Sequence, residues 1–347
     1  NNNISIDGST DLAFSDNTNL RFKSVNWEVY SGEGHDHKNI YDLFKKAQIS
    51  NAPCLLNFKT TIGFGSPNKS AKASSHGSPL GSDEVNLTRN KLSWSEKPFQ
   101  IPDKLLKIWR GSAYKNKKLY KKSKSTFHSN LSKKDIDKIF NKIELDLKNF
   151  NSDQATRKSS EAILNYIEGD HPIIGGSADL TGSNNTKGKE MSVMNSKNMS
   201  GQYIHYGVRE HGMAAIMNGI AATKIYKTYS GTFLSFADYM KPSLRLAALM
   251  KIDPIQVFTH DSIGLGEDGP THQPIEQINM LRIIPNSYVF RPCDLKETIV
   301  CWKEALKIDN APSFICLSRQ NLPQISNKKL VSKNFKGAYV ISCLLYT

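Results

Sequence analysis

The stretch THDSIGLGEDGPTHQP, residues 259–274, decides which kind of α/β fold the chain is expected to adopt. Its glycines reproduce the G-x-G-x-x-G spacing of a dinucleotide-binding turn. That turn needs a helix that opens at its third glycine, whereas Pro270 follows Gly269 here. Two carboxylates, Glu267 and Asp268, would also face a pyrophosphate that they repel. The stretch therefore does not predict dinucleotide binding.

The two histidines of this stretch, His260 and His272, do not predict a metal site either. Neither has a second histidine three or four residues away, the short spacing typical of zinc ligands. Both follow an apolar strand predicted over residues 254–259, at the end where parallel sheets bind ligands. Polar side chains at that place favour a polyhydroxylated or phosphorylated substrate, with a purely structural role for each histidine as the alternative.

Further apolar runs on both sides of this stretch alternate between strand and helix character. Strands are predicted over residues 54–58, 171–180, 254–259, 287–292 and 313–319, and helices over 38–47, 156–169, 208–222, 274–284 and 296–307. This alternation predicts doubly wound parallel sheets with helices on both faces. The Gly/Ser/Pro-rich segment 60–84 is predicted to be a functional loop. The tail at 336–347 reads as a strand cut off before its partners.

Composition restricts the class of protein. A length of 347 residues accommodates two domains, and 38% hydrophobic residues is typical of a soluble protein. The sequence shows no secretory signal and no apolar run of about 18 residues that could span a membrane. Five scattered cysteines predict no disulfide framework or zinc site, so a reducing, cytoplasmic location is expected.

Much of the net charge of +14 lies in the Lys-rich segment 114–138. Interleaved aromatic residues such as Tyr114 and Phe127 would suit contact with nucleic acid. A solvated linker is the favoured interpretation, because runs of like charge repel one another and stay in water.

Two features leave structural and functional interpretations open. Glu210 stands at the entrance to an apolar helix, where a carboxylate is costly unless it is paired, protonated or used in function. A helix cap or an ion pair with Arg209 is the structural alternative. The spacing of Phe233, Phe236 and Tyr239 fits either a core stripe or an aromatic wall that grips a flat ring.

Taken together, the motifs resemble the transketolase family of thiamine-diphosphate enzymes. The matching stretches occur in order along nearly the whole chain outside the Lys-rich segment: NISIDG, TTIGFGSPNKS, SHGSPLG, GGSADLTGSN, YIHYGVREHGM, GTFLSFADY, THDSIGLGEDGPTHQP, RPCD and LSRQNLP. The resemblance implies a thiamine-diphosphate-binding fold. It also implies reversible transfer of a two-carbon glycolaldehyde unit from a ketose phosphate, such as xylulose 5-phosphate, to an aldose phosphate in the pentose phosphate pathway. In the family this transfer proceeds through a carbanion of the cofactor.

The resemblance also implies how the cofactor is held. Glu210 matches the glutamate that hydrogen-bonds the aminopyrimidine ring and promotes its imino tautomer. Around the cofactor it implies the aromatic residues Phe233, Phe236 and Tyr239, the loop acid Asp179, and His76. The side chain of Asn2 and the carbonyl of Ile4 match ligands of the Mg²⁺ ion, or of Ca²⁺ in its place, since hard cations take oxygen ligands.

On the substrate side the resemblance implies a phosphate-binding set, which comprises Arg157, Ser183, His260 and Arg319. Asp268 matches the carboxylate that reads a sugar hydroxyl. His272 and His76 match histidines at the reacting carbons, where they donate hydrogen bonds or move protons.

The same resemblance predicts the domain organisation. It assigns residues 1–112 to the C-terminal part of the diphosphate-binding domain, 113–150 to the Lys-rich linker, 151–325 to the pyrimidine-binding domain and 326–347 to the truncated start of a linker or C-terminal domain. The chain is therefore expected to be a fragment that lacks the start of the diphosphate-binding domain and the C-terminal domain. A homodimer is expected of the full enzyme, and poor activity of the chain alone.

Three alternatives remain. The chain could be a non-catalytic binding or dimerisation module. It could resemble dihydroxyacetone synthase, which differs mainly in its acceptor. Deoxyxylulose-phosphate synthase is disfavoured, because His260, Pro274 and the SRQNLP stretch fit transketolase instead.

Overall fold

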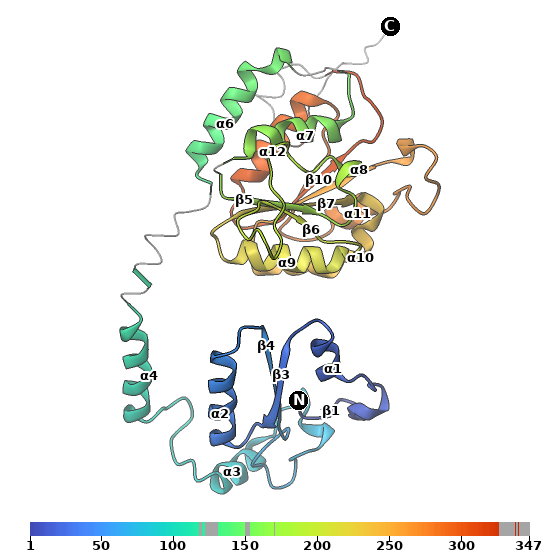
Figure 1. Ribbon diagram of the computed structural model, residues 1–347. Helices are drawn as coiled ribbons and strands as arrows, with labels where there is room; N and C mark the ends of the chain where they lie inside the picture. Colours follow the sequence, from blue (N-terminus) through green and yellow to red (C-terminus); the bar gives the residue numbers. More distant parts are fainter. Residues whose placement is uncertain are drawn as a thin grey trace. The chain divides into compact units, whose positions relative to one another are not determined.

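The computed structural model describes residues 1–117, 120–121, 131–149, 153–169, 171–325, 337 and 339 (Figure 1). The chain divides into two compact units, residues 1–117 and 118–347. The strand predicted over 336–347 and the middle of the Lys-rich segment lie outside the described residues, apart from 337 and 339.

A six-stranded parallel sheet forms the centre of the second unit, in the order β6-β5-β7-β8-β10-β9. Its strands are β5 (Ile173–Ser177), β6 (Tyr203–His205), β7 (Lys227–Phe233), β8 (Ile255–Thr259), β9 (Tyr288–Phe290) and β10 (Ser313–Leu317). The chain runs from β5 outward to β6 and then returns to β7 on the other side of β5. The order of strands thus reverses between β5 and β7, and ligands of such sheets bind at the carboxyl ends beside this reversal.

Helices cover both faces of this sheet, which confirms the predicted fold class for this unit (Figure 1). One face packs against α6 (Lys133–Leu145), α7 (Thr156–Ile167) and α12 (Leu295–Lys307). The other packs against α9 (Glu210–Ala222), α10 (Ala237–Met250) and α11 (Gln277–Arg282). Successive residues of a strand point to opposite faces of the sheet. Val257 therefore packs in the core on the side of α6, α7 and α12, and Phe258 in the core on the side of α9, α10 and α11. A short helix, α8 (Thr181–Asn184), follows β5.

Helix α6 departs from the predicted linker over residues 113–150. Its residues Ile136, Ile139, Phe140 and Ile143 recur at helical spacing and are buried in the same core as α7 and α12. The high lysine content concealed this apolar stripe, since the lysines occupy the outer face of an amphipathic helix. Part of the predicted linker is therefore a structural element of the second unit.

Strand β7 was not predicted, because its sequence KTYSGTF begins with a charge and contains small polar residues. Every residue of β7 is nevertheless buried. The ammonium of Lys227 at its start forms an ion pair with Asp253 at 2.5 Å and donates a hydrogen bond to the carbonyl of Ile308 at 2.8 Å. Pairing of this kind is what allows a charge to be buried.

The first unit contains a parallel strand pair, β3 (Glu28–Glu33) and β4 (Cys54–Lys59). Helix α2 (His37–Gln48) connects them, in agreement with the predicted helix over 38–47. The first unit also contains β1 (Ile4–Ser5), β2 (Gly8–Ser9), α1 (Thr18–Lys23), α3 (Ser82–Lys91) and α4 (Asp103–Lys115), besides two short 3-10 helices. In both units together, no helix among the described residues is both long and apolar enough to cross a membrane.

Candidate functional site

The carboxyl ends of the strands in the second unit bring predicted site residues from separate parts of the chain to one edge of the sheet. Asp179 follows β5, Phe233 ends β7, His260 follows β8 and Arg319 follows β10. Asp179 and His260 adopt left-handed backbone conformations, with φ of 63° and 58°. Non-glycine residues adopt this conformation rarely, although Asp and His do so more often than most.

His260 is buried and lies flat against Phe233, with ring centroids 3.7 Å apart. The sheet register explains this contact, because Phe233 pairs with Thr259, the residue before His260. Burial is the main cause that lowers the pKa of His260 to about 4, the nearby charges of Arg157 and Arg319 act in the same direction, and Asp268 opposes them. The imidazole is therefore neutral at physiological pH.

Two guanidinium groups lie near His260. Arg157, on α7, donates a hydrogen bond from Nη1 to the carbonyl of Ser183, while its buried Nε has no acceptor among the described residues. Burial and the charge of Arg319 lower the pKa of Arg157 from its usual range. Arg319 forms an exposed ion pair with Glu267 at 3.3 Å. Two like charges and an unused buried donor create a strong preference for an anion.

The loop after β8 brings His272 close to Phe233, the residue that stacks on His260. The His272 ring lies 5.2 Å from that of Phe236 and 5.9 Å from that of Phe233, both edge-on. The Thr271 hydroxyl is within 2.8 Å of His272 Nδ1. Asp268 is exposed and close enough to influence the pKa of His260. The structure thus brings together the residues that the sequence predicted to act from one loop.

The aromatic residues do not form a stripe on one helix. Phe233 ends β7, Phe236 lies in a 3-10 turn (Leu234–Phe236) and Tyr239 lies in α10. Their rings form a continuous row, with centroids 5.7 Å and 5.9 Å apart. Tyr239 is 65% exposed and Phe233 is buried, so the row extends from the core to the surface.

Glu210 begins α9 and is buried. Its carboxylate forms no hydrogen bond or ion pair with the residues that the structure describes. The alternative of an ion pair with Arg209 is wrong, because these two described side chains form none, and the Arg209 guanidinium instead donates to the carbonyl of Tyr206 at 3.0 Å. The Glu210 oxygens are not closed off from solvent, and the first turn of α9 favours a negative charge, so the carboxylate is available to a ligand.

The predicted residues of the first unit lie apart from this set in the chain. Asn2 Oδ1 accepts a hydrogen bond from the backbone of Ile4 at 2.9 Å. Within the described residues there is no group of three or more His, Cys, Asp or Glu side chains that could hold a metal ion. The oxygen donors of Asn2 and Ile4 suit a hard cation but are fewer than the six ligands that Mg²⁺ takes.

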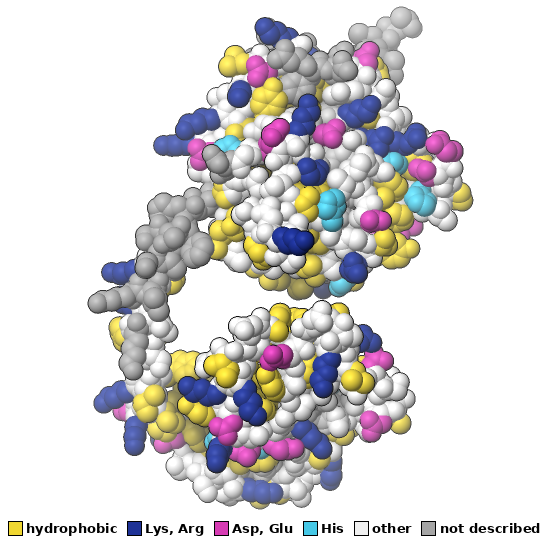
Figure 2. Space-filling view, viewed as in Figure 1, with side chains coloured by type: hydrophobic (Ala, Val, Ile, Leu, Met, Phe, Trp, Pro, Cys, Tyr) yellow, Lys and Arg dark blue, Asp and Glu magenta, His cyan; other side chains and the backbone are white. Residues whose placement is uncertain are grey.

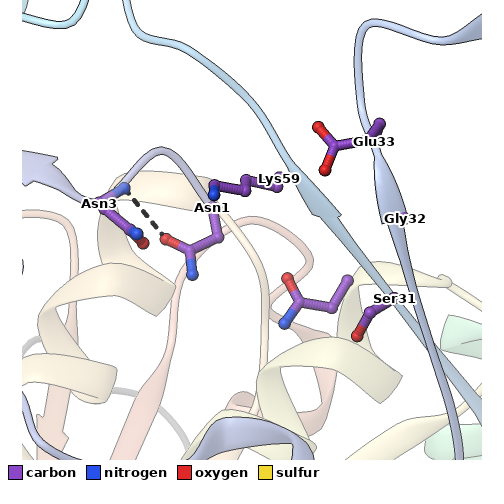
Figure 3. A pocket seen from close by; sticks show the side chains of 7 residues that line it. Asn1, Asn3, Ser31, Gly32, Glu33 and Lys59 are labelled. Atoms are coloured by element: carbon purple, nitrogen blue, oxygen red, sulfur yellow. Dashed lines mark hydrogen bonds between the residues drawn. The ribbon is translucent and has the colours of Figure 1, made fainter.

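A pocket of about 380 Å³ lies at the start of the chain, and neither Asn2 nor Ile4 lines it (Figure 3). Its lining comes from the carboxyl ends of β3 and β4 and from the start of the chain: Asn1, Asn3, Ser31, Gly32, Glu33, Asn57 and Lys59. It therefore lies at the edge of the strand pair where α/β proteins bind ligands.

His76 lies in the predicted functional loop, and its side chain is exposed. Glu84 organises the first part of this loop. Its carboxylate accepts hydrogen bonds from the Ser66 hydroxyl and from the backbone and side chain of Asn68. These bonds lower the pKa of Glu84 to about 2. The loop is thus held by a defined carboxylate network.

Sequence reasoning missed a buried set behind His260, which comprises Ser177, Asn184 and Thr259. They lie on β5, α8 and β8, and a chain of hydrogen bonds connects them. No spacing rule links these positions, so no sequence signal identified them.

Figure 2 shows Lys and Arg side chains spread over the visible face of both units, with Asp and Glu among them. Among the described residues of this face, no single basic patch of the kind that marks nucleic-acid binding is visible.

The structure contains features that fit the cofactor predicted from the sequence. The unpartnered Glu210 carboxylate suits a ring nitrogen or amine, and the aromatic row suits a flat heterocycle. Residues 152–324 match the family model described as "Transketolase, pyrimidine binding domain", and residues 1–143 match "Transketolase, thiamine diphosphate binding domain". Fold and site together define a member of the thiamine-diphosphate-binding class of α/β proteins.

Individual relatives identify the family. Transketolase of Buchnera aphidicola subsp. Baizongia pistaciae is 43% identical over 364 residues, which cover 98% of this chain and 54% of that protein. Transketolase 2 of Escherichia coli is 42% identical over 360 residues, with 98% and 54% covered. The chain belongs to the transketolase family. It spans about half the length of the curated relatives it matches.

Solved structures agree. The transketolase from Campylobacter jejuni has a TM-score of 0.81 and 40% identity, and the match covers 94% of this chain and 52% of that one. A Pichia stipitis transketolase variant in complex with xylulose-5-phosphate has a TM-score of 0.84 and 37% identity, with 96% and 53% covered.

Proposed function

We propose that this protein contributes the pyrimidine-binding domain, and part of the diphosphate-binding domain, of a transketolase. It would transfer a two-carbon glycolaldehyde unit from a ketose phosphate such as xylulose 5-phosphate to an aldose phosphate. The observation that carries this proposal is the edge of the sheet where Arg157, His260 and Arg319 converge beside the aromatic row. Guanidinium groups there suit a phosphate, and the exposed Asp268 suits a sugar hydroxyl.

Thiamine diphosphate, when bound, supplies the carbon nucleophile of such a reaction. Glu210 would accept a hydrogen bond from the aminopyrimidine, and its burial strengthens that bond. Phe233, Phe236 and Tyr239 would contact the ring faces, and Asp179 would lie beside the cofactor. His76 and His272 would donate hydrogen bonds or move protons at the substrate oxygens.

Several finer points belong to the same proposal. Asn2 and Ile4 would hold Mg²⁺, or Ca²⁺ in its place. A homodimer in the cytoplasm, acting in the pentose phosphate pathway, is proposed for the whole enzyme. Exposed apolar side chains on α9 and α10, namely Ile216, Leu246, Leu249 and Met250, support a protein partner at these helices. Cys54, Cys293, Cys301 and Cys316 are free thiols, which suits a reducing compartment.

The test combines binding with turnover, because we expect the chain alone to be poorly active. Calorimetric titration with xylulose 5-phosphate should show binding that Arg157→Ala abolishes. Lys158→Ala, which removes the same charge from the exposed neighbouring position, should bind as the wild type does. Equal affinity for unphosphorylated xylulose would contradict the phosphate site.

Turnover is measured with xylulose 5-phosphate, ribose 5-phosphate, thiamine diphosphate and Mg²⁺. Two-carbon transfer that is lost in Glu210→Gln supports the proposal. Enzyme-like rates from the chain by itself would refute the expectation of poor activity. Preference for formaldehyde as acceptor would favour a dihydroxyacetone synthase instead. Intact dimers that bind neither sugar phosphate nor cofactor would favour a non-catalytic module.

A further inference from the structure

A buried chain of hydrogen bonds runs from the backbone of β7 to the imidazole of His260. The Ser177 hydroxyl donates to the carbonyl of Gly231 at 3.1 Å, and Ser177 Oγ accepts from the Asn184 amide nitrogen at 3.2 Å. Asn184 Oδ1 accepts from the Thr259 hydroxyl at 2.6 Å, and Thr259 Oγ1 lies 3.0 Å from His260 Nδ1. Every member of the chain is buried.

The direction of each bond follows from the one before it. A carbonyl can only accept, so Ser177 donates its single hydroxyl proton to the carbonyl of Gly231. The Ser177 oxygen must then accept from the Asn184 amide nitrogen. The amide oxygen of Asn184 therefore faces Thr259, and the Thr259 hydroxyl donates its proton to that oxygen. Thr259 Oγ1 can then only accept from His260, and Nδ1 of that ring must carry the proton.

We infer that the Ser177–Asn184–Thr259 chain holds His260 in the Nδ1–H tautomer, so that Nε2 presents a lone pair to the substrate site. Asn184 and Thr259 are thus positioning residues, which act through His260. The neutral state on which this tautomer depends has independent support, because the burial of the ring disfavours its charged form.

This tautomer has a consequence for anion binding, which rests on the proposed function of His260 at a sugar phosphate. A lone pair on Nε2 repels a phosphate oxygen, so His260 can donate to the dianion only after Nε2 takes up a proton. Binding of a dianion should therefore be coupled to uptake of one proton. The other charged and titratable groups near the ring are Arg157 on α7, Arg319 after β10, and Asp268 and His272 in its own loop.

The direct test is ¹⁵N NMR of the imidazole in the free chain at neutral pH. We expect Nε2 of His260 to show the shift of an unprotonated, pyridine-type nitrogen, and Nδ1 that of a protonated one. Thr259→Ser keeps the hydroxyl and should preserve this pattern. Thr259→Val has nearly the same shape without the hydroxyl and should move the proton to Nε2. A protonated Nε2 in the wild type, as a reversed Asn184 amide would give, overturns the inference. An unchanged tautomer in Thr259→Val overturns it as well.

Sulfate, which stays a dianion across this range, probes the coupling to anion binding. Between pH 5.5 and 7.5 the wild-type affinity should fall by up to about tenfold per pH unit, the limit for uptake of one proton. Thr259→Val should show a markedly shallower slope, and Asp268→Asn and His272→Gln should keep the steep one. Equal slopes in wild type and Thr259→Val would contradict the coupling. Failure of the proposed function would appear as equal affinity for xylulose 5-phosphate and unphosphorylated xylulose, and it would leave the tautomer measurement intact.

Discussion

Lys227 and Asp253 form an ion pair in which both side chains are almost fully buried, at the end of β7 opposite to Phe233 and the candidate site. Asp253 also pairs with Lys224, which is 45% exposed, at 2.8 Å. One carboxylate therefore serves a buried cation and an exposed one. This arrangement allows the two contributions to be compared within the same network.

We expect Asp253→Ala to lower the free energy of unfolding by about 3–5 kcal/mol, because it leaves the buried Lys227 ammonium without its main partner. Lys224→Ala should cost only about 1 kcal/mol, since it removes a solvent-screened pair and an exposed hydrogen bond to the Asp309 carbonyl. Urea titration measures the free energy of unfolding of each variant. Hydrogen exchange of the β7 and β8 amides then measures the local stability of these two strands. Similar losses in the two variants would show that burial does not decide the strength of this pair.

Because the Glu84 carboxylate holds the loop at residues 60–84, the conformational order of this loop should depend on pH. The pKa of Glu84 falls from the usual 4.5 to about 2 on folding, so its contribution is fully present above pH 4.5. That contribution should disappear as the pH falls from 4.5 toward 2. Protection of the Asn68 amide from hydrogen exchange, corrected for intrinsic rates, should follow this course. Glu84→Gln should show weak protection at every pH, and strong protection in that variant would contradict the role of the carboxylate.

Glu210→Gln should separate stability from function. The free energy of unfolding should change by less than about 1 kcal/mol, because the amide has the same shape and, among the described residues, the lost charge interacts only with the N-terminus of α9. Activation of bound thiamine diphosphate, followed as deuterium exchange at the thiazolium carbon, should fall by about 10²–10⁴-fold. Glu190→Gln, at an exposed position, serves as the matched control. A large loss of stability with normal exchange would make Glu210 a structural residue.

Asp268→Ala should alter the choice of donor sugar and leave the fold unchanged. The side chain is exposed and makes no hydrogen bond or ion pair within the described part of the chain, so the free energy of unfolding should change by less than about 0.5 kcal/mol. The ratio of kcat/KM between two donors that differ at one hydroxyl should decrease by about 10- to 100-fold. A change of this size corresponds to the loss of one hydrogen bond to a charged group. Equal losses for all donors would count against a role in stereochemical discrimination.

The sequence predicted those buried strands and helices whose residues form apolar runs. Strands such as β8 and β10 are apolar enough to be recognised, whereas β7 is buried with Lys227, Thr228 and Ser230 in its sequence. Lys227 and Ser230 are tolerated because their partners lie on other strands and loops, which no local pattern encodes. For the same reason the sequence identified His260 but not Asn184, whose contacts come from β5 and β8.

Helix α6 shows a different kind of error, since its apolar spacing was visible in the sequence. Composition outweighed periodicity in that segment: the lysines suggested a solvated run, while Ile136, Ile139, Phe140 and Ile143 marked one helical face. Counting charges over a window discards the angular position of each residue around a helix.

The place of α6 also sets where this polypeptide can be divided in gene fission or domain exchange. The family model of the first domain extends to residue 143, yet Phe140 and Ile143 are packed into the core of the second unit. A breakpoint at residue 150 would remove that packing and leave α7 and α12 with an uncovered apolar surface. Recombination that preserves a folded pyrimidine-binding domain must therefore cut upstream of Leu131, inside the stretch that sequence families assign to its neighbour.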